Sequence, residues 1–298
     1  MGLSQSRTSI SIIVPVHNEE DRIQSCIQRL LSYCKEKEWD FELLFVQDNG
    51  TDNTSSIVTR FSLSESRIKM LNLPTRLGKG GSIISAALSC NTKEYLTYMD
   101  VDLSAAPSEL ERLLPFMHNH DVVIGSRILR GNLHAIERPF YRSLLSNSYS
   151  MLFRILFRIP IHDPQCGLKV FRKEIISKLF GEVTVTSFAF DTDLIVKAFA
   201  QGLRIKEVPI NWTHGPASKI RILTEIRSMG LDLFSIWYHY HLYWRQNKTS
   251  YPQKRGSIFG RVLFGLLSVS GEIKKRPLKY LNLRSQIANT DRQQKANA

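Results

Sequence analysis

The sequence predicts an α/β fold in which a mostly parallel sheet carries helices on both faces. Short runs of β-branched and large apolar residues alternate with helix-like segments through the first two thirds of the 298-residue chain. The predicted strands are apolar almost throughout, which is typical of parallel strands covered on both sides. Polar clusters rich in Asp, Asn and Gly follow several of them, at the position where open α/β sheets bind ligands.

Each expected strand is rich in Val, Ile, Leu, Phe or Tyr and is bounded by polar residues or glycine. The expected strands cover residues 9–15, 41–47, 67–71, 95–99, 121–125 and 204–210. Helical periodicity between the first five strands predicts helices over residues 19–37, 53–61, 80–89 and 107–118. Asp52 and Ala106 lie near the starts of the second and fourth of these helices.

After residue 146 the pattern changes to segments that are apolar or aromatic nearly all round. Residues 150–160 carry Arg154 and Arg158 four residues apart, and residues 229–244 gather Trp and Tyr beside two His. A packed core helix explains each segment alone, but Trp, Tyr and Arg also favour the boundary between hydrocarbon and water. We therefore expect three regions, namely a domain over 1–225 with a candidate interfacial helix at 150–160, membrane-associating helices over 226–283, and a disordered tail over 284–298.

The formal net charge of +13 implies an anionic partner, such as nucleic acid, an acidic membrane surface or a phosphorylated ligand. The basic residues are dispersed and form no recognisable nucleic-acid-binding motif, so we expect no nucleic acid. The chain has four cysteines without metal-ligand spacing, which predicts free thiols in a reducing cytosol: Cys26, Cys34, Cys90 and Cys166. The apolar run at 258–269 contains Arg261 and is shorter than the roughly 18 residues of a spanning helix.

The most informative segment is Asp100-Val101-Asp102, which directly follows the strand expected at 95–99. Two carboxylates at the C-terminal end of a buried strand would project into the ligand crevice. Carboxylate oxygens hold Mg²⁺ or Mn²⁺ and leave positions for water and phosphate oxygens. The segment predicts a site for a nucleotide diphosphate and its metal, although Asp residues that cap the helix at 107–118 would give the same short pattern.

Further polar segments follow strands at matching positions. Residues 15–19 (Pro-Val-His-Asn-Glu) could hydrogen-bond a base or ribose, although an acidic side chain also suits the start of a helix. Asp48, beside an Asn-Gly turn, could accept a hydrogen bond from a ribose hydroxyl or a base N–H. The glycine-rich turn at 76–81 with Lys79 suits a phosphate, and Arg127 after the fifth strand supplies a fork of donors.

In this order and spacing, the segments resemble glycosyltransferase family 2 with its GT-A (Rossmann-like) fold. Residues 162–171 (His-Asp-Pro-Gln-Cys-Gly-Leu-Lys-Val-Phe), 188–194 (Phe-Ala-Phe-Asp-Thr-Asp-Leu) and 207–212 (Glu-Val-Pro-Ile-Asn-Trp) are most similar to the dolichyl-phosphate β-glucosyltransferase branch. Dolichyl-phosphate mannose synthases look like close relatives. The sequence departs from the family pattern at Gln47, where many members have Asp, and at His17, where Tyr is commoner.

The resemblance implies an inverting, metal-dependent transfer of a sugar onto a polyprenyl (dolichyl) phosphate, with UDP-glucose favoured over GDP-mannose as donor. The implied nucleotide-binding residues are Pro15, His17, Asn18, Glu19, Val46, Asp48 and Lys79. The implied ligands of Mg²⁺ or Mn²⁺ are Asp100, Asp102 and Ser104, and the implied contacts to the donor or acceptor phosphate are Arg127, Arg142 and Lys219. Asp100, Asp102 and Asp191 are the implied catalytic residues.

A lipid monophosphate has a second pKa of about 6, so it is largely ionised at neutral pH and needs no general base. Asp191 and Asp193 are the candidate bases for a hydroxyl acceptor, and capping of the following helix is their simpler role. A glycan hydroxyl acceptor and a non-catalytic sugar-nucleotide-binding scaffold remain as alternatives. We expect peripheral attachment at the cytoplasmic membrane face, without the N-terminal membrane anchor of the eukaryotic glucosyltransferases.

Overall fold

The structure, a computed structural model, describes residues 7–129, 140–213 and 222–247. Within the helices, the side chains of residues 140–145, 222–228 and 242–247 lie outside this description. The chain divides into two compact units, Met1–Leu233 and Phe234–Ala298. The first unit holds the whole sheet and the predicted site.

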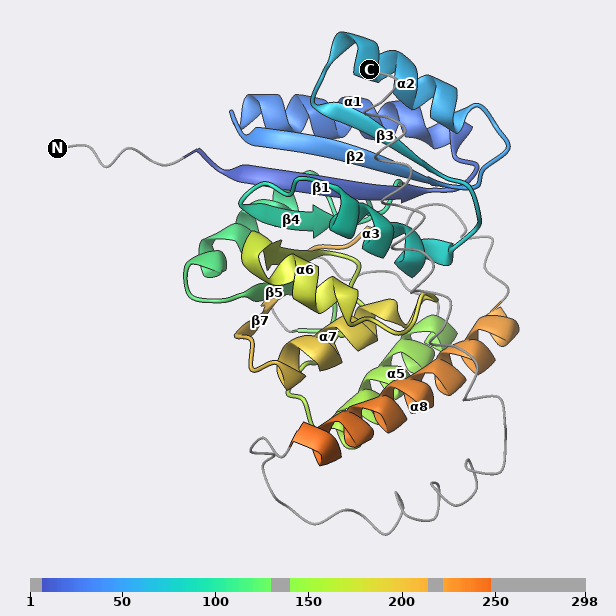
Figure 1. The fold of residues 1–298 in the computed structure, drawn as a ribbon, viewed down its shortest axis with the longest axis vertical. Coiled ribbons are helices and arrows are strands. Elements are labelled where there is room, and N and C mark those ends of the chain that lie inside the picture. Colours follow the sequence, from blue (N-terminus) through green and yellow to red (C-terminus); the bar gives the residue numbers. More distant parts are fainter. Residues whose placement is uncertain (1–6, 130–139, 214–221, 248–298) are drawn as a thin grey trace, which may run out of the picture. The chain divides into compact units, whose positions relative to one another are not determined.

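Seven strands form one sheet in the order β3-β2-β1-β4-β6-β5-β7 (Figure 1). The strands are β1 (Ser9–Val16), β2 (Asp40–Asp48), β3 (Ile68–Leu73), β4 (Tyr95–Tyr98), β5 (Val122–Ser126), β6 (Lys169–Arg172) and β7 (Ile205–Pro209). β6 runs antiparallel to both of its neighbours, and the other strand pairs are parallel. The start of β6 therefore lies at the same edge as the C-terminal ends of the other strands, and the predicted mostly parallel sheet is confirmed.

The chain crosses the sheet so that helices cover both faces. The helices α1 (Glu20–Glu36) and α2 (Thr54–Ser64) belong to two successive crossovers in the same direction, from β1 to β2 and from β2 to β3. Right-handed crossovers place both helices on one face, and the return to β4 places α3 (Gly78–Ser89) on the other. On that face α3 contacts α6 (Lys173–Gly181), which contacts α7 (Phe190–Ala200) (Figure 1).

The single helix expected over residues 107–118 is wrong. This segment consists of η1 (Pro107–Glu109), α4 (Leu110–Leu113) and η2 (Leu114–His118), so regular α-helix covers only its centre. Pro115 has no amide hydrogen and its ring clashes with the carbonyl four residues earlier, which interrupts an α-helix at this point. The buried side chains of Leu110, Leu113 and Met117 still provide the apolar face that gave the helical pattern.

Two elements were missing from the expected list, and the helices expected at 150–160 and 229–244 are several residues longer than expected. The missing pair is β6 and α6, which are consecutive in the sequence. The segment at 150–160 is the end of α5 (Phe140–Phe157), and the aromatic segment at 229–244 lies within α8 (Ile222–Asn247). The predicted disordered tail at 284–298, and the part of the helical region from residue 248 on, lie outside the described residues.

The second unit contributes the described end of α8, from Phe234 to Asn247. Its aromatic residues contact one another along the helix, since the rings of Trp237 and His241 lie 4.6 Å apart. The Nδ1 atom of His239 donates to the carbonyl of Ser235 at 2.7 Å. The helix is thus confirmed, and its role at a membrane surface stays a prediction.

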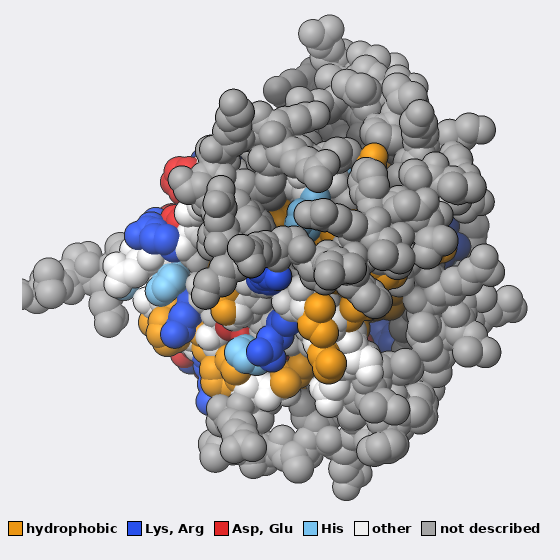
Figure 2. All heavy atoms as spheres, turned by 90° about the horizontal axis from the view of Figure 1, so that it is seen from below, with side chains coloured by type: hydrophobic (Ala, Val, Ile, Leu, Met, Phe, Trp, Pro, Cys, Tyr) orange, Lys and Arg blue, Asp and Glu red, His pale blue; other side chains and the backbone are white. Residues whose placement is uncertain are grey.

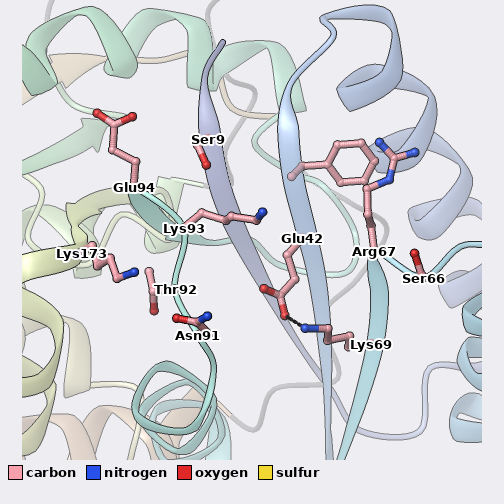
Figure 3. Close-up of a pocket in the computed structure, with 11 residues that line it drawn as sticks. Ser9, Glu42, Ser66, Arg67, Lys69, Asn91, Thr92, Lys93, Glu94 and Lys173 are labelled. Carbon is pink, nitrogen blue, oxygen red and sulfur yellow. Dashed lines mark ion pairs between the residues drawn. The ribbon is translucent and has the colours of Figure 1, made fainter. Parts of the chain in front are cut away.

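At the N-terminal edge of the sheet, the starts of β1, β2 and β4 border a hollow of about 410 Å³ (Figure 3). Its basic residues are Arg67, Lys69, Lys93 and Lys173. Lys69 Nζ lies 2.7 Å from the Glu42 carboxylate and Lys93 Nζ lies 2.9 Å from that of Asp40. These two lysines are therefore balanced by adjacent carboxylates, and the hollow lies at the opposite edge of the sheet from the predicted site.

Candidate active site

The loops after β1 and β2 are joined to each other by hydrogen bonds. His17 Nδ1 donates to the carbonyl oxygen of Asp48 at 2.8 Å, and Asn18 Oδ1 accepts from the amide of Thr51 at 2.8 Å. Asn18 has a φ of 56°, a left-handed conformation that Asn adopts more readily than most residues. Because Nδ1 of His17 donates, Nε2 of the neutral ring remains an acceptor. The predicted base or ribose contacts are thus held on a fixed double loop.

Three other predicted nucleotide residues lie around this double loop. Pro15 is half-buried at the end of β1, and Glu19 precedes α1. The amide of Glu19 donates to Thr54 Oγ1 at 2.9 Å, and its carboxylate pairs with Arg22 at 2.6 Å. Val46 is fully buried and belongs to the core of the sheet. The nucleotide contacts of all three stay predictions.

The carboxylate of Asp48 fixes the start of α3. Its Oδ1 accepts from the amide of Leu77 at 2.6 Å, and its Oδ2 accepts from the amide of Gly78 at 2.9 Å. Gly78 has a φ of +78°, which glycine adopts without the strain of a side chain. Asp48 therefore satisfies two amides at the helix start and places Lys79 at the C-terminal edge.

Lys79 links the glycine-rich turn to the Asp-Val-Asp segment. Its Nζ lies 2.5 Å from Asp100 Oδ1, and the two side chains are 21% and 31% exposed. Burial opposes the charge of Lys79, but the carboxylates of Asp100 and Asp191 outweigh it and raise the pKa of this ammonium above its ordinary value. The turn thus brings a permanent positive charge to the predicted metal and diphosphate site.

The loop after β4 turns back on itself at Asp102. Asp102 Oδ1 accepts from the amide of Ser104 at 2.9 Å, and Leu103 between them has a φ of 50°. The N-cap residue of η1 is Ala106, and no side chain caps this helix. The alternative in which the Asp pair caps the helix at 107 is therefore wrong. Ser104 is buried, and its carbonyl accepts from the amide of Thr213 at 2.8 Å.

Gly167 and Trp212 border the Asp100 carboxylate. A Cβ atom on Gly167 would lie 3.2 Å from Asp100 Oδ2 and 3.4 Å from Trp212 Cη2. A side chain at this position would therefore enter the space beside the carboxylate. The neighbouring Asn211 donates to the buried carboxylate of Glu109 from both its backbone and its side chain, at 3.1 Å each. The family segments at 162–171 and 207–212 thus meet at Asp100.

Arg127 forms a buried fork with Asp163. Its Nε and Nη2 each donate to one oxygen of the carboxylate at 2.8 Å, and its amide donates to Oδ2 at 2.9 Å. The guanidinium lies 5.2 Å from the ring centre of Trp212. Burial disfavours the Asp163 charge, but Arg127 outweighs it and holds the pKa of this carboxyl below its ordinary value. Arg127 is thus placed beside the site by Asp163, and its contact with a phosphate stays a prediction.

Asp191 lies in the first turn of α7 and is almost fully buried. Its Oδ1 accepts from Lys169 Nζ and from the hydroxyl of Tyr98. The next carboxylate, Asp193, has no exposed surface, and its Oδ2 accepts from the amide of Thr184 at 2.6 Å. Asp193 therefore holds the loop before α7, whereas Asp191 joins the group of charges around Lys79.

Two predicted phosphate contacts fall outside this description. Arg142 belongs to α5, but its side chain lies outside the described residues. Lys219 lies in the segment 214–221, which is also outside them. The roles of both residues stay predictions.

Comparison with known proteins assigns the chain to a family. Residues 11–180, more than half of the chain, match the sequence profile described as Glycosyl transferase family 2. The chain belongs to glycosyl transferase family 2. It is therefore a glycosyltransferase, and the resemblance inferred from the ordered motifs is confirmed.

Among curated relatives, a dolichyl-phosphate β-glucosyltransferase from Drosophila melanogaster is 30% identical over 78% of this chain and 75% of its own length. The human dolichyl-phosphate β-glucosyltransferase is 28% identical over 80% of this chain and 77% of its own length. A third relative of that name, from Saccharomyces cerevisiae, is 28% identical over 80% of this chain and 77% of its own. The likeness extends well beyond the matched family profile, into the segments that follow residue 180.

The fold is similar to that of glucosyl-3-phosphoglycerate synthase from Mycobacterium tuberculosis. One structure of that protein, in complex with Mn²⁺, UDP and glucosyl-3-phosphoglycerate, gives a TM-score of 0.56 at 18% identity and covers 79% of this chain and 80% of its own. Another, with Mg²⁺ and UDP, gives 0.55 at 16% identity and covers 79% of each chain. At this identity the comparison shows the fold alone, and it confirms the expected GT-A architecture.

The residues present in this family 2 member suit a divalent cation shared with a diphosphate. Asp100 and Asp102 lie in one loop, and the Asp100 side chain is accessible. Among the described residues, no group of three or more His, Cys, Asp and Glu side chains surrounds a common metal position. Two carboxylates completed by phosphate and water oxygens are the usual protein environment of Mg²⁺. The Asp pair therefore fits a metal that is bound together with its nucleotide.

Sequence reasoning missed four residues that build the site. Asp163, Lys169 and Trp212 lie within the quoted family segments, but nothing in those segments shows their partners. Tyr98 was assigned only to the core of a strand, and its hydroxyl reaches Asp191. A buried Lys or Asp is seldom found without a charged partner, and this rule could have suggested the pairs.

Proposed function

We propose that this glycosyltransferase moves glucose from UDP-glucose onto the phosphate of dolichyl phosphate. The observation that carries the proposal is the likeness, over more than three quarters of the chain, to relatives named dolichyl-phosphate β-glucosyltransferase. The location of the Asp100–Asp102 pair at the C-terminal edge of the sheet supports a nucleotide-sugar donor.

The donor would lie across the C-terminal ends of β1, β2 and β4. The double loop of His17, Asn18 and Asp48 would contact the nucleoside, and the Asp pair would hold Mg²⁺ or Mn²⁺ against the diphosphate. The metal would offset the negative charge that the leaving diphosphate gains during transfer. Lys79, which contacts Asp100, would contribute a second positive charge there.

A phosphate acceptor is compatible with the hydrogen bonds that Asp191 accepts. This carboxylate accepts from two buried donors, Lys169 and Tyr98, which fix it in place. A phosphate acceptor is already ionised, so the protein needs to orient it rather than remove its proton. Arg127, Arg142 and Lys219 would contribute the positive charge around the donor and acceptor phosphates.

A lipid acceptor requires the site to approach a membrane, and α5 offers an exposed face for this. Met151 and Ile155 are 65% and 60% exposed, and the neighbouring Arg154 and Arg158 are exposed as well. In Figure 2, which views the molecule from below Figure 1, described hydrophobic side chains lie beside basic ones. Within the described residues, no helix has the length and apolar character needed to span a bilayer. We propose that this face of α5 lies in the interface, with its arginines at anionic headgroups.

The function is tested by incubating the protein with dolichyl phosphate in liposomes and with labelled UDP-glucose or GDP-mannose. We expect a glucosyl lipid from UDP-glucose, lost on addition of EDTA and in Asp102→Ala. Formation of a mannosyl lipid would show that GDP-mannose is the donor instead of UDP-glucose. Transfer to a glycan hydroxyl without any lipid product would overturn the acceptor assignment.

The membrane surface is tested by sedimentation with vesicles that contain anionic lipid. The double variant Met151→Asn/Ile155→Asn should bind at least about tenfold more weakly, because it removes two exposed apolar side chains from the contact. Leu63, which is 85% exposed on α2, provides the matched control, and Leu63→Asn should bind like the wild type. Equal binding by all three proteins would contradict the proposed docking face.

A further inference from the structure

Lys169 is a fully buried lysine at the edge of the sheet where the site lies. It is the first residue of the antiparallel strand β6, so it pairs in register with Tyr98 at the end of β4. Its side chain has no exposed surface. Its Nζ donates to the carbonyl of Cys166 at 2.6 Å and to Asp191 Oδ1. The ammonium group of Lys169 therefore contacts Asp191 from the buried interior of the protein.

Tyr98 approaches the same oxygen of Asp191. Its hydroxyl donates to Oδ1, and its ring packs against Phe171 and Phe190 at centroid distances of 6.0 and 5.6 Å. Burial and the adjacent Asp191 charge raise the pKa of Tyr98 well above its ordinary value, so the hydroxyl keeps its proton and remains a donor. Two donors of fixed geometry thus meet on one carboxylate oxygen.

The other oxygen of Asp191, Oδ2, accepts no hydrogen bond from the described residues. Among the described residues, the fully buried side-chain atoms without a hydrogen-bond partner include Asp193 Oδ1 but not Asp191 Oδ2. Asp191 as a whole keeps 4% of its surface exposed, whereas Asp193 keeps none. The charge of Asp191 acts on Lys79, whose Nζ contacts Asp100. Asp191 therefore lies close enough to act on the lysine that contacts Asp100.

The pair of Lys169 and Asp191 is poorly explained by stability alone. Removing two charges from water costs about as much as their attraction returns, and apolar residues of similar size often stabilise a core better. A buried pair of this kind does fix the orientation of its carboxylate. An anionic oxygen so fixed repels a phosphate but accepts a hydrogen bond from a neutral hydroxyl.

We propose that Lys169 is a positioning residue, which with Tyr98 holds Asp191 Oδ1 so that Oδ2 accepts a hydrogen bond from a hydroxyl of the donor hexose. This inference rests on the proposed function for the nature of the donor. It assigns to Asp191 the binding of the sugar rather than the removal of a proton. It also assigns a role to Lys169, which contacts no substrate itself.

The test compares the affinities of UDP and UDP-glucose, measured by calorimetry with Mn²⁺ and without any lipid acceptor. Asp191→Asn and Lys169→Met should weaken binding of UDP-glucose by about tenfold or more and leave that of UDP unchanged, because UDP lacks the hexose. Tyr98→Phe, which removes one donor and keeps the ring, should cause a smaller selective loss of roughly two- to tenfold. A purely structural role would weaken both ligands equally.

The matched control is Tyr149→Phe, because Tyr149 also contacts the first turn of α7 through a 2.8 Å hydrogen bond between its hydroxyl and that of Thr192. It should leave the ratio of the two affinities unchanged. If Lys169→Met does not fold, Tyr98→Phe and Asp191→Asn decide the matter. Equal weakening of both ligands, or no weakening in Asp191→Asn, would overturn the inference. Donor binding that is normal in the wild type without glucose transfer to dolichyl phosphate would overturn the proposed function instead.

Discussion

At the N-terminal edge of the sheet, two lysines that line the hollow in Figure 3 are paired with carboxylates, Lys69 with Glu42 and Lys93 with Asp40. At the C-terminal edge, the carboxylates of Asp100 and Asp102 both act on the single ammonium group of Lys79. The two lysines at the first edge are thus each paired with a carboxylate, whereas at the second edge two described carboxylates share one ammonium group. The proposed divalent cation would offset the remaining negative charge.

The two edges also differ in how their ion pairs are held. The side chains of Lys93 and Asp40 are 33% and 46% exposed, so water screens their attraction. Asp163 is 1% exposed, and its fork with Arg127 is shielded from water. In this molecule an accessible hollow is therefore a weaker sign of function than buried charges at strand ends.

The largest effect is expected at the Arg127–Asp163 fork. Asp163→Asn removes the carboxylate that forms the fork with a buried guanidinium, so the free energy of unfolding should fall by about 3–5 kcal/mol. The matched change at the opposite edge, Asp40→Asn, should cost about 1 kcal/mol or less. Urea unfolding of the three proteins measures both values. Similar losses at the two edges would remove the distinction between them.

The same fork should give the stability a dependence on acid. The pKa of Asp163 lies below its ordinary value of 3.8, because the opposing effect of burial is outweighed by Arg127. A carboxyl with a lowered folded pKa stabilises the protein above its unfolded pKa and loses this effect as the pH falls through the folded value. The difference in unfolding free energy between wild type and Asp163→Asn should be constant above about pH 5 and shrink below about pH 4. A difference that persists undiminished in acid would contradict this assignment.

The charged group at the C-terminal edge should be needed for transfer. Asp100→Asn removes a carboxylate from the proposed metal site, and the rate of glucose transfer should fall by roughly 10²–10³-fold, as when one stabilising group of a transition state is lost. Lys93→Ala, at the other edge, should transfer at the wild-type rate. Initial rates under saturating donor measure both. A comparable loss of transfer rate in Lys93→Ala would indicate that the active site lies at the N-terminal edge instead.

A smaller effect is expected where α3 begins. A Cβ on Gly80 would lie 2.6 Å from Phe190 Cβ and 2.8 Å from the carbonyl oxygen of Thr186, so Gly80→Ala should cost about 1–3 kcal/mol of unfolding free energy. Gly230 in α8 has open space around it, and Gly230→Ala should instead stabilise the protein by up to about 1 kcal/mol. Thermal unfolding compares the two. If Gly80→Ala leaves the free energy of unfolding unchanged, the close approach of α3 to the loop before α7 is not required for stability.

Sequence patterns located the strand ends well, because the apolar runs of β1, β2 and β4 stop at the polar residues that the crevice needs. The antiparallel strand β6 was not predicted, since its four residues, Lys169 to Arg172, begin and end with charged side chains. Its position between β4 and β5 also breaks the simple alternation of strand and helix.

The side-chain partners were less accessible to prediction than the strand ends. Arg127 and Asp163 are 36 residues apart, and Lys169 and Asp191 are 22 apart, so neither pair leaves a local pattern. Asp48 was assigned to a ligand, and the structure shows that it also holds the start of α3. Such contacts depend on the order of the strands, which no single segment of sequence contains.

The central claim is that the nucleotide binds with a metal at the C-terminal edge. Calorimetric titration of UDP in the presence of Mn²⁺ tests it most directly, with the wild type, Asp102→Asn and Lys173→Ala compared side by side. The account predicts that Asp102→Asn loses the metal-dependent part of the binding and that Lys173→Ala binds like the wild type. Metal-dependent binding that survives in Asp102→Asn and is lost in Lys173→Ala would contradict it.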